Sequence, residues 1–174
     1  MYLLVTGFYA FLSHLDYLYA AVAAYLCGCF NGALFTSRLF FHDDVRTHGS
    51  GNAGSTNMLR NYGKLPAVAT ILGDMAKVAV AILLVRLLVG NELYAQQPIF
   101  IKSFAGLFCV LGHIFPCFFR FKGGKGVATC GGMVFMIDWR IALILLAVFF
   151  VAVLITKWVS LGSILMAILY PVLM

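Results

Sequence analysis

The sequence predicts an all-α protein that spans a membrane several times and forms a single membrane domain over residues 1–174. Hydrophobic residues make up 63% of the chain and charged residues 10%, and the mean hydropathy is +1.01. So few polar side chains cannot cover the surface of a soluble domain. The apolar residues come in runs, many near the roughly 20 residues that a helix needs to cross a bilayer. About six transmembrane helices are predicted.

The apolar runs follow one another with short polar interruptions. The first 17 residues contain His14 and Asp16 and are expected to form an interfacial or additional helical segment. The first span contains many small residues, among them Gly28 and Gly32, which permit close helix packing in lipid. The fourth span is short and is expected to be tilted or partly re-entrant. The six predicted spans are 18–41, 65–89, 98–119, 127–137, 141–156 and 158–174.

Two ionisable residues lie inside the second span. Asp74 and Lys77 are three residues apart, so they share one face of a helix and can form an ion pair. Ionisable groups are costly inside a membrane and usually face the protein interior or a wet cavity. Two roles stay open for this pair: it packs two helices together, or it supports a neighbouring functional site.

The cations predict the orientation of the chain. With alternating crossings, three cations fall on one side of the membrane, and eight fall on the other. Because positive residues collect on the cytoplasmic side, the N-terminus is expected outside and both polar loops in the cytoplasm. The net charge of +6 is therefore interpreted as a topology signal, and no nucleic-acid partner is expected. The cytoplasmic group is Arg38, Arg46, Arg60, Lys64, Arg120, Lys122, Lys125 and Lys157, and the other is Arg86, Lys102 and Arg140.

The polar loop over residues 42–64 has the composition of an anion site. Its central part combines three glycines with hydroxyl and amide side chains and Arg60, and it contains no carboxylate. Glycine allows the backbone to approach a ligand and to adopt positive φ, and N–H and guanidinium donors suit a phosphate. The alternative is a solvated connection that ends in an ordinary helix cap. The adjacent Asp43 and Asp44 are expected to solvate the loop.

A second glycine-rich loop lies at residues 120–126. Lys122, Gly123, Gly124, Lys125 and Gly126 precede a predicted helix, whose N-terminus adds positive potential. This pattern is typical of a phosphate cradle, although it is not a Walker A loop. The alternative is a basic anchor beside acidic lipid headgroups. Both loops face the same compartment, so one composite site is predicted.

His113 lies just before the second loop, and three roles stay open for it: general base, hydrogen-bond donor to phosphate, or a helix-end histidine bonded to backbone. The five cysteines lack paired C-x-x-C spacing and are interpreted as small buried hydrophobes. No metal site, disulfide framework or cofactor is therefore predicted.

These motifs resemble those of the bacterial acyl-phosphate:glycerol-3-phosphate acyltransferases, the PlsY family. Residues 49–64 (GSGNAGSTNMLRNYGK) are similar to its first motif, and residues 112–116 (GHIFP) with 121–129 (FKGGKGVAT) to its second. Asp74, Lys77 and residues 159–163 (VSLGS) also match, and the resemblance covers about 25–174. One departure lies at residues 28–31, which read Gly-Cys-Phe-Asn in place of the more usual Gly-Ser-Ile-Pro.

The resemblance implies transfer of an acyl chain from acyl phosphate to the 1-hydroxyl of glycerol 3-phosphate in the bacterial inner membrane, giving lysophosphatidic acid and phosphate, the first step of phospholipid synthesis. It implies that Ser50 and Arg60 act in catalysis. His113 is a further catalytic candidate because of its position beside the second loop. The partners are acyl phosphate, glycerol 3-phosphate and membrane lipid. The residues expected to hold phosphate are Gly49, Gly51, Asn52, Thr56, Asn57, Lys122, Gly123, Gly124, Lys125 and Gly126.

The family's third motif, a histidine followed by Asn, Arg and Glu, does not occur among these 174 residues. The sixth span leaves the cytoplasm, so the motif is expected on the far side of a seventh span. Two other function classes stay open. One is a membrane transporter of a phosphorylated metabolite with the loops as gates, and the other is an inactive truncated homologue.

Overall fold

The structure, a computed structural model, describes the backbone of residues 2–174 and the side chains from Leu15 onward. Within this range the chain is helical and contains no strand, as predicted. The backbone of residues 2–17 is helical and continues into α1. The predicted interfacial position of the segment at 1–17 falls mainly on residues whose side chains are not described, and it stays a prediction. The elements are α1 (Tyr2–Cys29), α2 (Gly32–Phe41), η1 (Val45–Thr47), α3 (Ser55–Tyr62), α4 (Lys64–Val89), α5 (Asn91–Gln96), α6 (Pro98–Ile114), η2 (Cys117–Phe119), α7 (Val127–Ile137), α8 (Trp139–Thr156) and α9 (Val159–Leu173).

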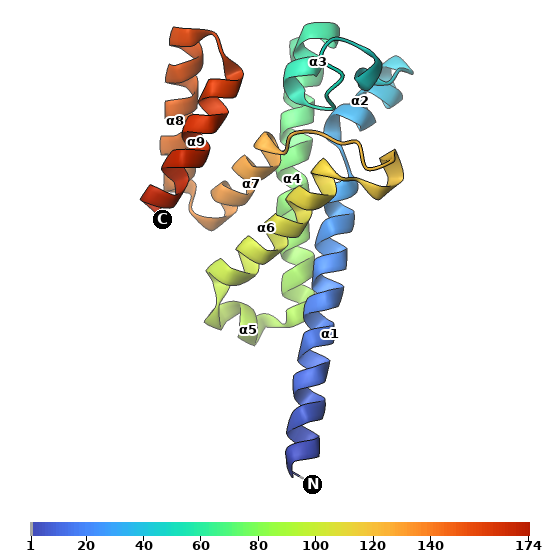
Figure 1. The fold of residues 1–174 in the computed structure, drawn as a ribbon, viewed down its shortest axis with the longest axis vertical. Helices are drawn as coiled ribbons and strands as arrows, with labels where there is room; N and C mark the ends of the chain where they lie inside the picture. The colour runs from blue at the N-terminus through green and yellow to red at the C-terminus, as the bar shows by residue number, and fades with distance from the viewer. Residues whose placement is uncertain (1) are drawn as a thin grey trace.

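The centre of the molecule is formed by α1, α4 and α6, and α7 packs against α4 and α6 (Figure 1). Small side chains such as Ala24, Ala81 and Ala105 are completely buried where these helices meet. A Cβ added at Gly28 would overlap the carbonyl of Cys109. The backbones of α1 and α6 are therefore in direct contact, an approach that small residues make possible in membrane helices.

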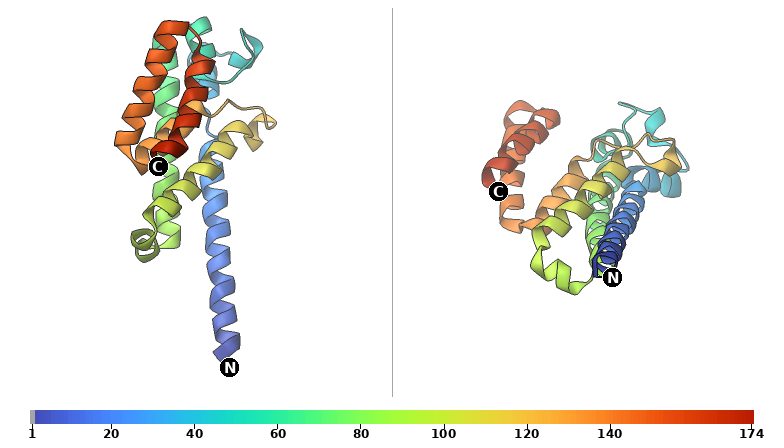
Figure 2. Two further views of the ribbon diagram at one scale, coloured as in Figure 1. Left: turned by 60° about the vertical axis from the view of Figure 1, so that its left-hand side comes forward. Right: turned by 60° about the horizontal axis from the view of Figure 1, so that its bottom comes forward.

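The helices α8 and α9 form an antiparallel hairpin at one side of the core (Figure 2). The main contact of this hairpin with the rest of the protein is through α7. Among the described residues, three helices are long and apolar enough to cross a membrane alone: α4, the segment Pro98–Phe119 and α8. The shorter apolar helices α7 and α9 have 11 and 15 residues. The predicted spans are thus helical, although their lengths are unequal.

The first predicted span, 18–41, is a bent pair of helices that together are long and apolar enough for one broken span. The chain breaks after Cys29, and α1 and α2 meet at an angle of 41°. Asn31 causes this break locally, because its extended backbone begins α2 and its side-chain oxygen accepts a hydrogen bond from the N–H of Leu34 at 2.9 Å. This is ordinary N-cap chemistry placed inside an apolar run.

Asp74 and Lys77 stabilise this break from α4. The Lys77 ammonium donates to the carbonyl of Phe30 at 2.8 Å, and Asp74 accepts from the N–H of Gly32 at 3.2 Å. The predicted pair is confirmed, with 2.9 Å between the two charged groups and both side chains almost fully buried. A cation at the end of α1 and an anion at the start of α2 also match the two helix dipoles. These contacts support the role as an ion pair that packs helices, and the role as support for a neighbouring functional site stays a prediction.

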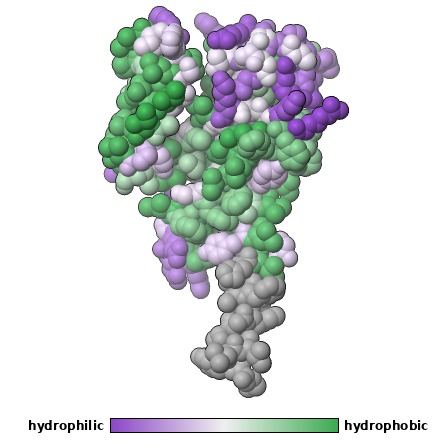
Figure 3. Space-filling view, viewed as in Figure 1, coloured by the Kyte–Doolittle hydropathy of each residue, from purple (hydrophilic) through white to green (hydrophobic). Residues whose placement is uncertain are grey.

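Hydrophilic residues collect at one end of the molecule, over α2, α3 and the connecting loops, with a smaller area near α5 (Figure 3). The surface between these areas is apolar, with exposed side chains such as Leu72, Leu83 and Leu87 on α4 and Leu154 and Ile155 on α8. This distribution is typical of a protein that faces lipid along its sides.

Candidate functional site

The first loop, residues 42–54, joins α2 to α3; it is shorter than the predicted 42–64 because residues 55–62 form α3. Asn57 on α3 stabilises this loop, and its side chain is 1% exposed. The Asn57 amide donates to the carbonyls of Val45 and His48, at 2.9 and 3.0 Å, and its oxygen accepts from the N–H of Ser50 at 3.1 Å. The predicted phosphate-binding role of Asn57 is therefore not supported, since its side chain is fully used in shaping the loop.

Two of the three glycines in the first loop have the backbone conformation that favours glycine. The φ angles of Gly49 and Gly51 are +56° and +68°, whereas Gly54 is extended. A Cβ at Gly49 would overlap the side-chain oxygen of Asn57. The glycines are thus required by the tight path of the loop itself.

Asp43 and Asp44 do not merely solvate the loop, in contrast to the prediction. Asp43 accepts hydrogen bonds from the hydroxyl of Tyr62 and from His48, both at 2.7 Å. These bonds lower the pKa of Asp43, while burial and the Asp43 contact raise the pKa of Tyr62 to about 12. Asp44 forms ion pairs with Arg46 at 2.7 Å and Arg38 at 3.0 Å, and its pKa is lowered mainly by Arg46.

Arg46 connects the first loop to the second loop. In the structure the second loop covers residues 115–126, because α6 ends at Ile114, and it is therefore longer than the predicted 120–126. One side of its guanidinium forms two hydrogen bonds with Asp44. The remaining nitrogen, Nη1, donates to the carbonyls of Phe119 at 3.1 Å and Lys122 at 3.0 Å. Arg46 was not among the predicted site residues, because its role depends on a contact across more than 70 positions of the sequence. The only local signal is the acidic residue two positions before it.

The second loop packs directly against the first. The N–H groups of Gly123 and Gly124 donate to the carbonyls of Ile114 and His113, at 3.1 and 3.2 Å. A Cβ at Gly124 would overlap the imidazole of His113 and lie 2.6 Å from the carbonyl of Ala53 in the first loop. The prediction that these two glycines offer their N–H groups to a phosphate is therefore corrected: the N–H groups are occupied, and close packing requires the glycines.

His113 adjoins the contact between Gly124 and Ala53 and is 3% exposed. Its Nδ1 is 2.6 Å from the Lys77 ammonium and 3.4 Å from the Asp74 carboxylate. The other edge of the ring faces Gly124. His113 thus joins the buried ion pair of α4 to the second loop. This favours a structural role, but one in which the ring contacts the side chains of Lys77 and Asp74 and not the backbone that the prediction named.

The two helices that directly follow the glycine loops begin without a side-chain cap among the described residues. They are α3, which begins after Gly54, and α7, which begins after Gly126, whose φ is +80°. The first N–H groups of a helix have no partner within the helix and attract anions. Thr129, in the first turn of α7, is buried, and its hydroxyl has no partner within the described part of the chain. Donors thus remain in both loops.

Several of the predicted site residues, among them three cations, lie on the surface. The side chains of Ser50, Arg60, Lys122 and Lys125 are exposed, and Asn52 and Thr56 are partly exposed. For the described residues, Arg60 forms no hydrogen bond or ion pair, so its guanidinium is available to a ligand. Among the described residues, no group of three or more metal-ligating side chains occurs.

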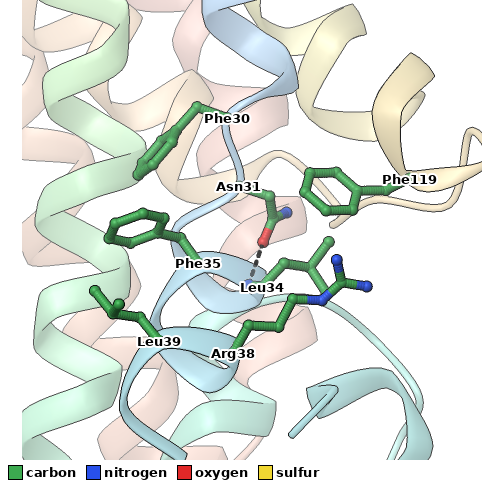
Figure 4. Close-up of a pocket in the computed structure, with 7 residues that line it drawn as sticks. All are labelled: Phe30, Asn31, Leu34, Phe35, Arg38, Leu39 and Phe119. Atoms are coloured by element: carbon green, nitrogen blue, oxygen red, sulfur yellow. Dashed lines mark hydrogen bonds between the residues drawn. The ribbon is translucent and has the colours of Figure 1, made fainter. Parts of the chain in front are cut away.

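A cavity of about 360 Å³ lies beside the helix break. Figure 4 shows Phe30, Phe35 and Leu39 on one side and Phe119 of the second loop on the other. The guanidinium of Arg38 lies 5.0 Å from the centre of the Phe119 ring. The cavity is therefore apolar, with one cation at its polar end.

The family model of glycerol-3-phosphate acyltransferase matches residues 18–174, which include both loops, the buried ion pair and the cavity. The chain belongs to this family. Similar curated members are the glycerol-3-phosphate acyltransferases of Francisella tularensis subsp. novicida (41% identical over 142 residues) and Pseudomonas putida (43% over 143 residues). Each alignment covers 82% of this chain, and the chain spans 66% and 72% of those two relatives.

Solved structures of the family agree with the fold. The chain is similar to two crystal structures of PlsY, described as an integral membrane glycerol 3-phosphate acyltransferase, in a glycerol 3-phosphate form and a lysophosphatidic acid form. The TM-scores are 0.73 and 0.72 at 35% and 34% identity, over 87% of this chain and 72% of each PlsY chain. The all-α, multi-pass membrane class predicted from the sequence is confirmed.

Proposed function

We propose that this protein transfers an acyl chain from acyl phosphate to the 1-hydroxyl of glycerol 3-phosphate, giving lysophosphatidic acid and inorganic phosphate. The observation that carries the proposal is the direct packing of the two glycine loops, through Gly124 against Ala53 and through Arg46. This packing brings two uncapped helix N-termini and several exposed cations to one end of the molecule. Two anionic substrates require such a concentration of donors.

The chemistry needs alignment more than activation, because a carboxylic–phosphoric anhydride is already reactive. The hydroxyl oxygen of glycerol 3-phosphate attacks the acyl carbon, the new ester bond forms, and the bond from that carbon to the phosphate oxygen breaks. A donor phosphate oxygen takes the proton. Because the substrate hydroxyl attacks the acyl carbon directly, no covalent acyl-enzyme is formed. Positioning of two bound reactants and stabilisation of developing charge supply the rate.

The catalytic roles of Ser50 and Arg60 are those that the resemblance implies, and their exposure is compatible with them. Ser50 and Arg60 are exposed and act on the reacting groups, and Lys122 and Lys125 neutralise phosphate charge. The N–H groups at the starts of α3 and α7 bind phosphate oxygens, in place of those of Gly123 and Gly124. His113, a catalytic candidate from its position in the sequence, acts as a positioning residue, since its ring is enclosed by Lys77, Asp74 and Gly124.

The acyl chain lies in the cavity beside the helix break. Its lining is almost entirely apolar, and the Arg38–Asp44–Arg46 contacts connect its polar end to both loops. The loops lie on the cytoplasmic side of a bacterial inner membrane with the N-terminus outside, in agreement with the distribution of cations.

The test is product formation by the purified 174-residue chain with acyl phosphate and glycerol 3-phosphate. Lysophosphatidic acid and phosphate should appear in equal amounts, and acyl-CoA should not replace the donor. Ser50→Ala and Arg60→Ala should abolish transfer and leave the elution profile in detergent unchanged. Equal turnover with acyl-CoA would contradict the donor, and full turnover in either variant would contradict the role of that residue.

The transporter alternative has little support in this arrangement. Transporters usually bind substrate near the middle of the bilayer. The deep charged pair here is occupied by the ends of α1 and α2 and by His113. An absence of product together with phosphate-ester uptake into liposomes would favour the transporter, and an absence of both would favour an inactive homologue.

A further inference from the structure

Two cysteines that are 88 positions apart in the sequence meet at the junction of α1 and the second loop. The sulfur of Cys29, the last residue of α1, is 3.7 Å from the sulfur of Cys117, the first residue of η2. Both are free thiols. Among the described residues, no other pair of cysteine sulfurs forms such a contact.

The backbones beside these cysteines are fixed close together. The hydroxyl of Tyr25, one helical turn before Cys29, donates to the carbonyl of Phe115 at 2.6 Å. A Cβ at Gly112 would lie 3.0 Å from the backbone nitrogen of Cys29. Pro116 restricts the chain directly before Cys117. The backbones that carry the two sulfurs are therefore held close together by the packing of α1 on α6.

From this geometry we propose that Cys29 and Cys117 are a reversible oxidation site that forms an intramolecular disulfide bond. A disulfide has an S–S distance of about 2.05 Å, so the sulfurs must approach by about 1.7 Å. Cys29 is 1% exposed and is held by the glycine-mediated packing, whereas Cys117 is partly exposed on a short turn. The required movement therefore falls on Cys117.

The proposed oxidant is a hydroperoxide. The Cys117 thiol is oxidised first, giving a sulfenic acid, while one peroxide oxygen is reduced and leaves as water or alcohol. The Cys29 sulfur then attacks the Cys117 sulfur, the S–S bond forms, and the sulfenic oxygen leaves as a second water. The two sulfurs together lose two electrons, which the peroxide accepts. A thiol reductant reverses the bond by exchange.

The bond would connect the helix break to the loop that carries Phe119. The carbonyl of Phe119 accepts a hydrogen bond from Arg46, so the movement of Cys117 toward α1 acts on the connection between the two loops. On the cytoplasmic side thiols are kept reduced, so the bond would form only on oxidation.

The test is peptide mapping by mass spectrometry of the purified protein after hydrogen peroxide and thiol blocking with N-ethylmaleimide. We expect one cross-linked species that joins the peptides of Cys29 and Cys117, lighter by two hydrogen atoms than their sum and lost after dithiothreitol. Cys29→Ser and Cys117→Ser should each remove it, and the matched control Cys130→Ser should retain it.

A second measurement assigns the order of the steps. In Cys29→Ser, dimedone should label Cys117 as a sulfenic acid, because its partner is missing. Maleimide modification of both Cys29 and Cys117 after peroxide treatment would overturn the proposal. A disulfide from Cys117 to any other cysteine, or to a second copy of the chain, would overturn it as well.

Discussion

Replacement of Arg46 by lysine separates the charge of this residue from its geometry. An ammonium can keep the ion pair with Asp44, but it cannot also donate to the carbonyls of Phe119 and Lys122, which Arg46 reaches at 3.1 and 3.0 Å. Hydrogen bonds to a charged group contribute about 1.5–3 kcal/mol each. The Arg46 side chain is 23% exposed, so water replaces part of the two bonds, and a net loss equal to about one of them, about 1.5–3 kcal/mol, is expected.

This loss corresponds to a roughly 10- to 100-fold decrease of kcat/KM, if the docked loops are the reactive state. The assay is lysophosphatidic acid formation at varied acyl phosphate and at varied glycerol 3-phosphate, and both kcat/KM values should fall together. The matched control is Arg86→Lys. Arg86 donates to the side-chain oxygen of Asn91 and lies over the ring of Tyr94, in the last turn of α4 and away from both loops. An unchanged kcat/KM in folded Arg46→Lys, or an equal decrease in the control, would refute the role of Arg46.

Three further predictions concern the loops and the cavity. Gly124→Ala should lower kcat/KM for both substrates at least tenfold, because the added methyl group collides with the ring of His113; an effect confined to the KM of acyl phosphate would instead indicate direct crowding of the donor. Because the folded pKa of Asp44 lies below its ordinary value, its ion pairs stabilise the protein above about pH 4, and this contribution is lost as the pH falls further. Thermal unfolding between pH 7 and 3 should therefore depend less on pH in Asp44→Asn than in the wild type, and parallel curves would contradict this. Leu39→Trp should fill part of the cavity and shift the preference severalfold toward shorter acyl phosphates, and an unchanged chain-length profile would place the acyl chain elsewhere.

The features that depend on local sequence were predictable. Composition and run length predict a multi-pass helical protein, and the spacing of Asp74 and Lys77 predicts their ion pair. The positions of the glycine loops in alternating crossings predict that both lie at one end, and the packing of Gly124 against the carbonyl of Ala53 agrees with this.

The features that depend on tertiary packing were not predictable. The break after Cys29 has a local cap, Asn31, but the charges that stabilise both of its ends come from α4, so the sequence around it gives only part of the signal. The N–H groups of Gly123 and Gly124 looked available, but the end of α6 occupies them. Arg46 and the Cys29–Cys117 contact likewise connect segments far apart in the chain, so the spacing of these residues in the sequence does not predict their contacts.

The central claim is that the two loops form one site, and a double-mutant cycle between them tests it most directly. We would measure kcat/KM for lysophosphatidic acid formation in Arg60→Lys, Lys125→Gln and the double variant. Groups that act on the same bound phosphates should show a coupling energy of about 0.5–3 kcal/mol. Losses that add to within about 0.5 kcal/mol would show that the loops act independently and would contradict the account.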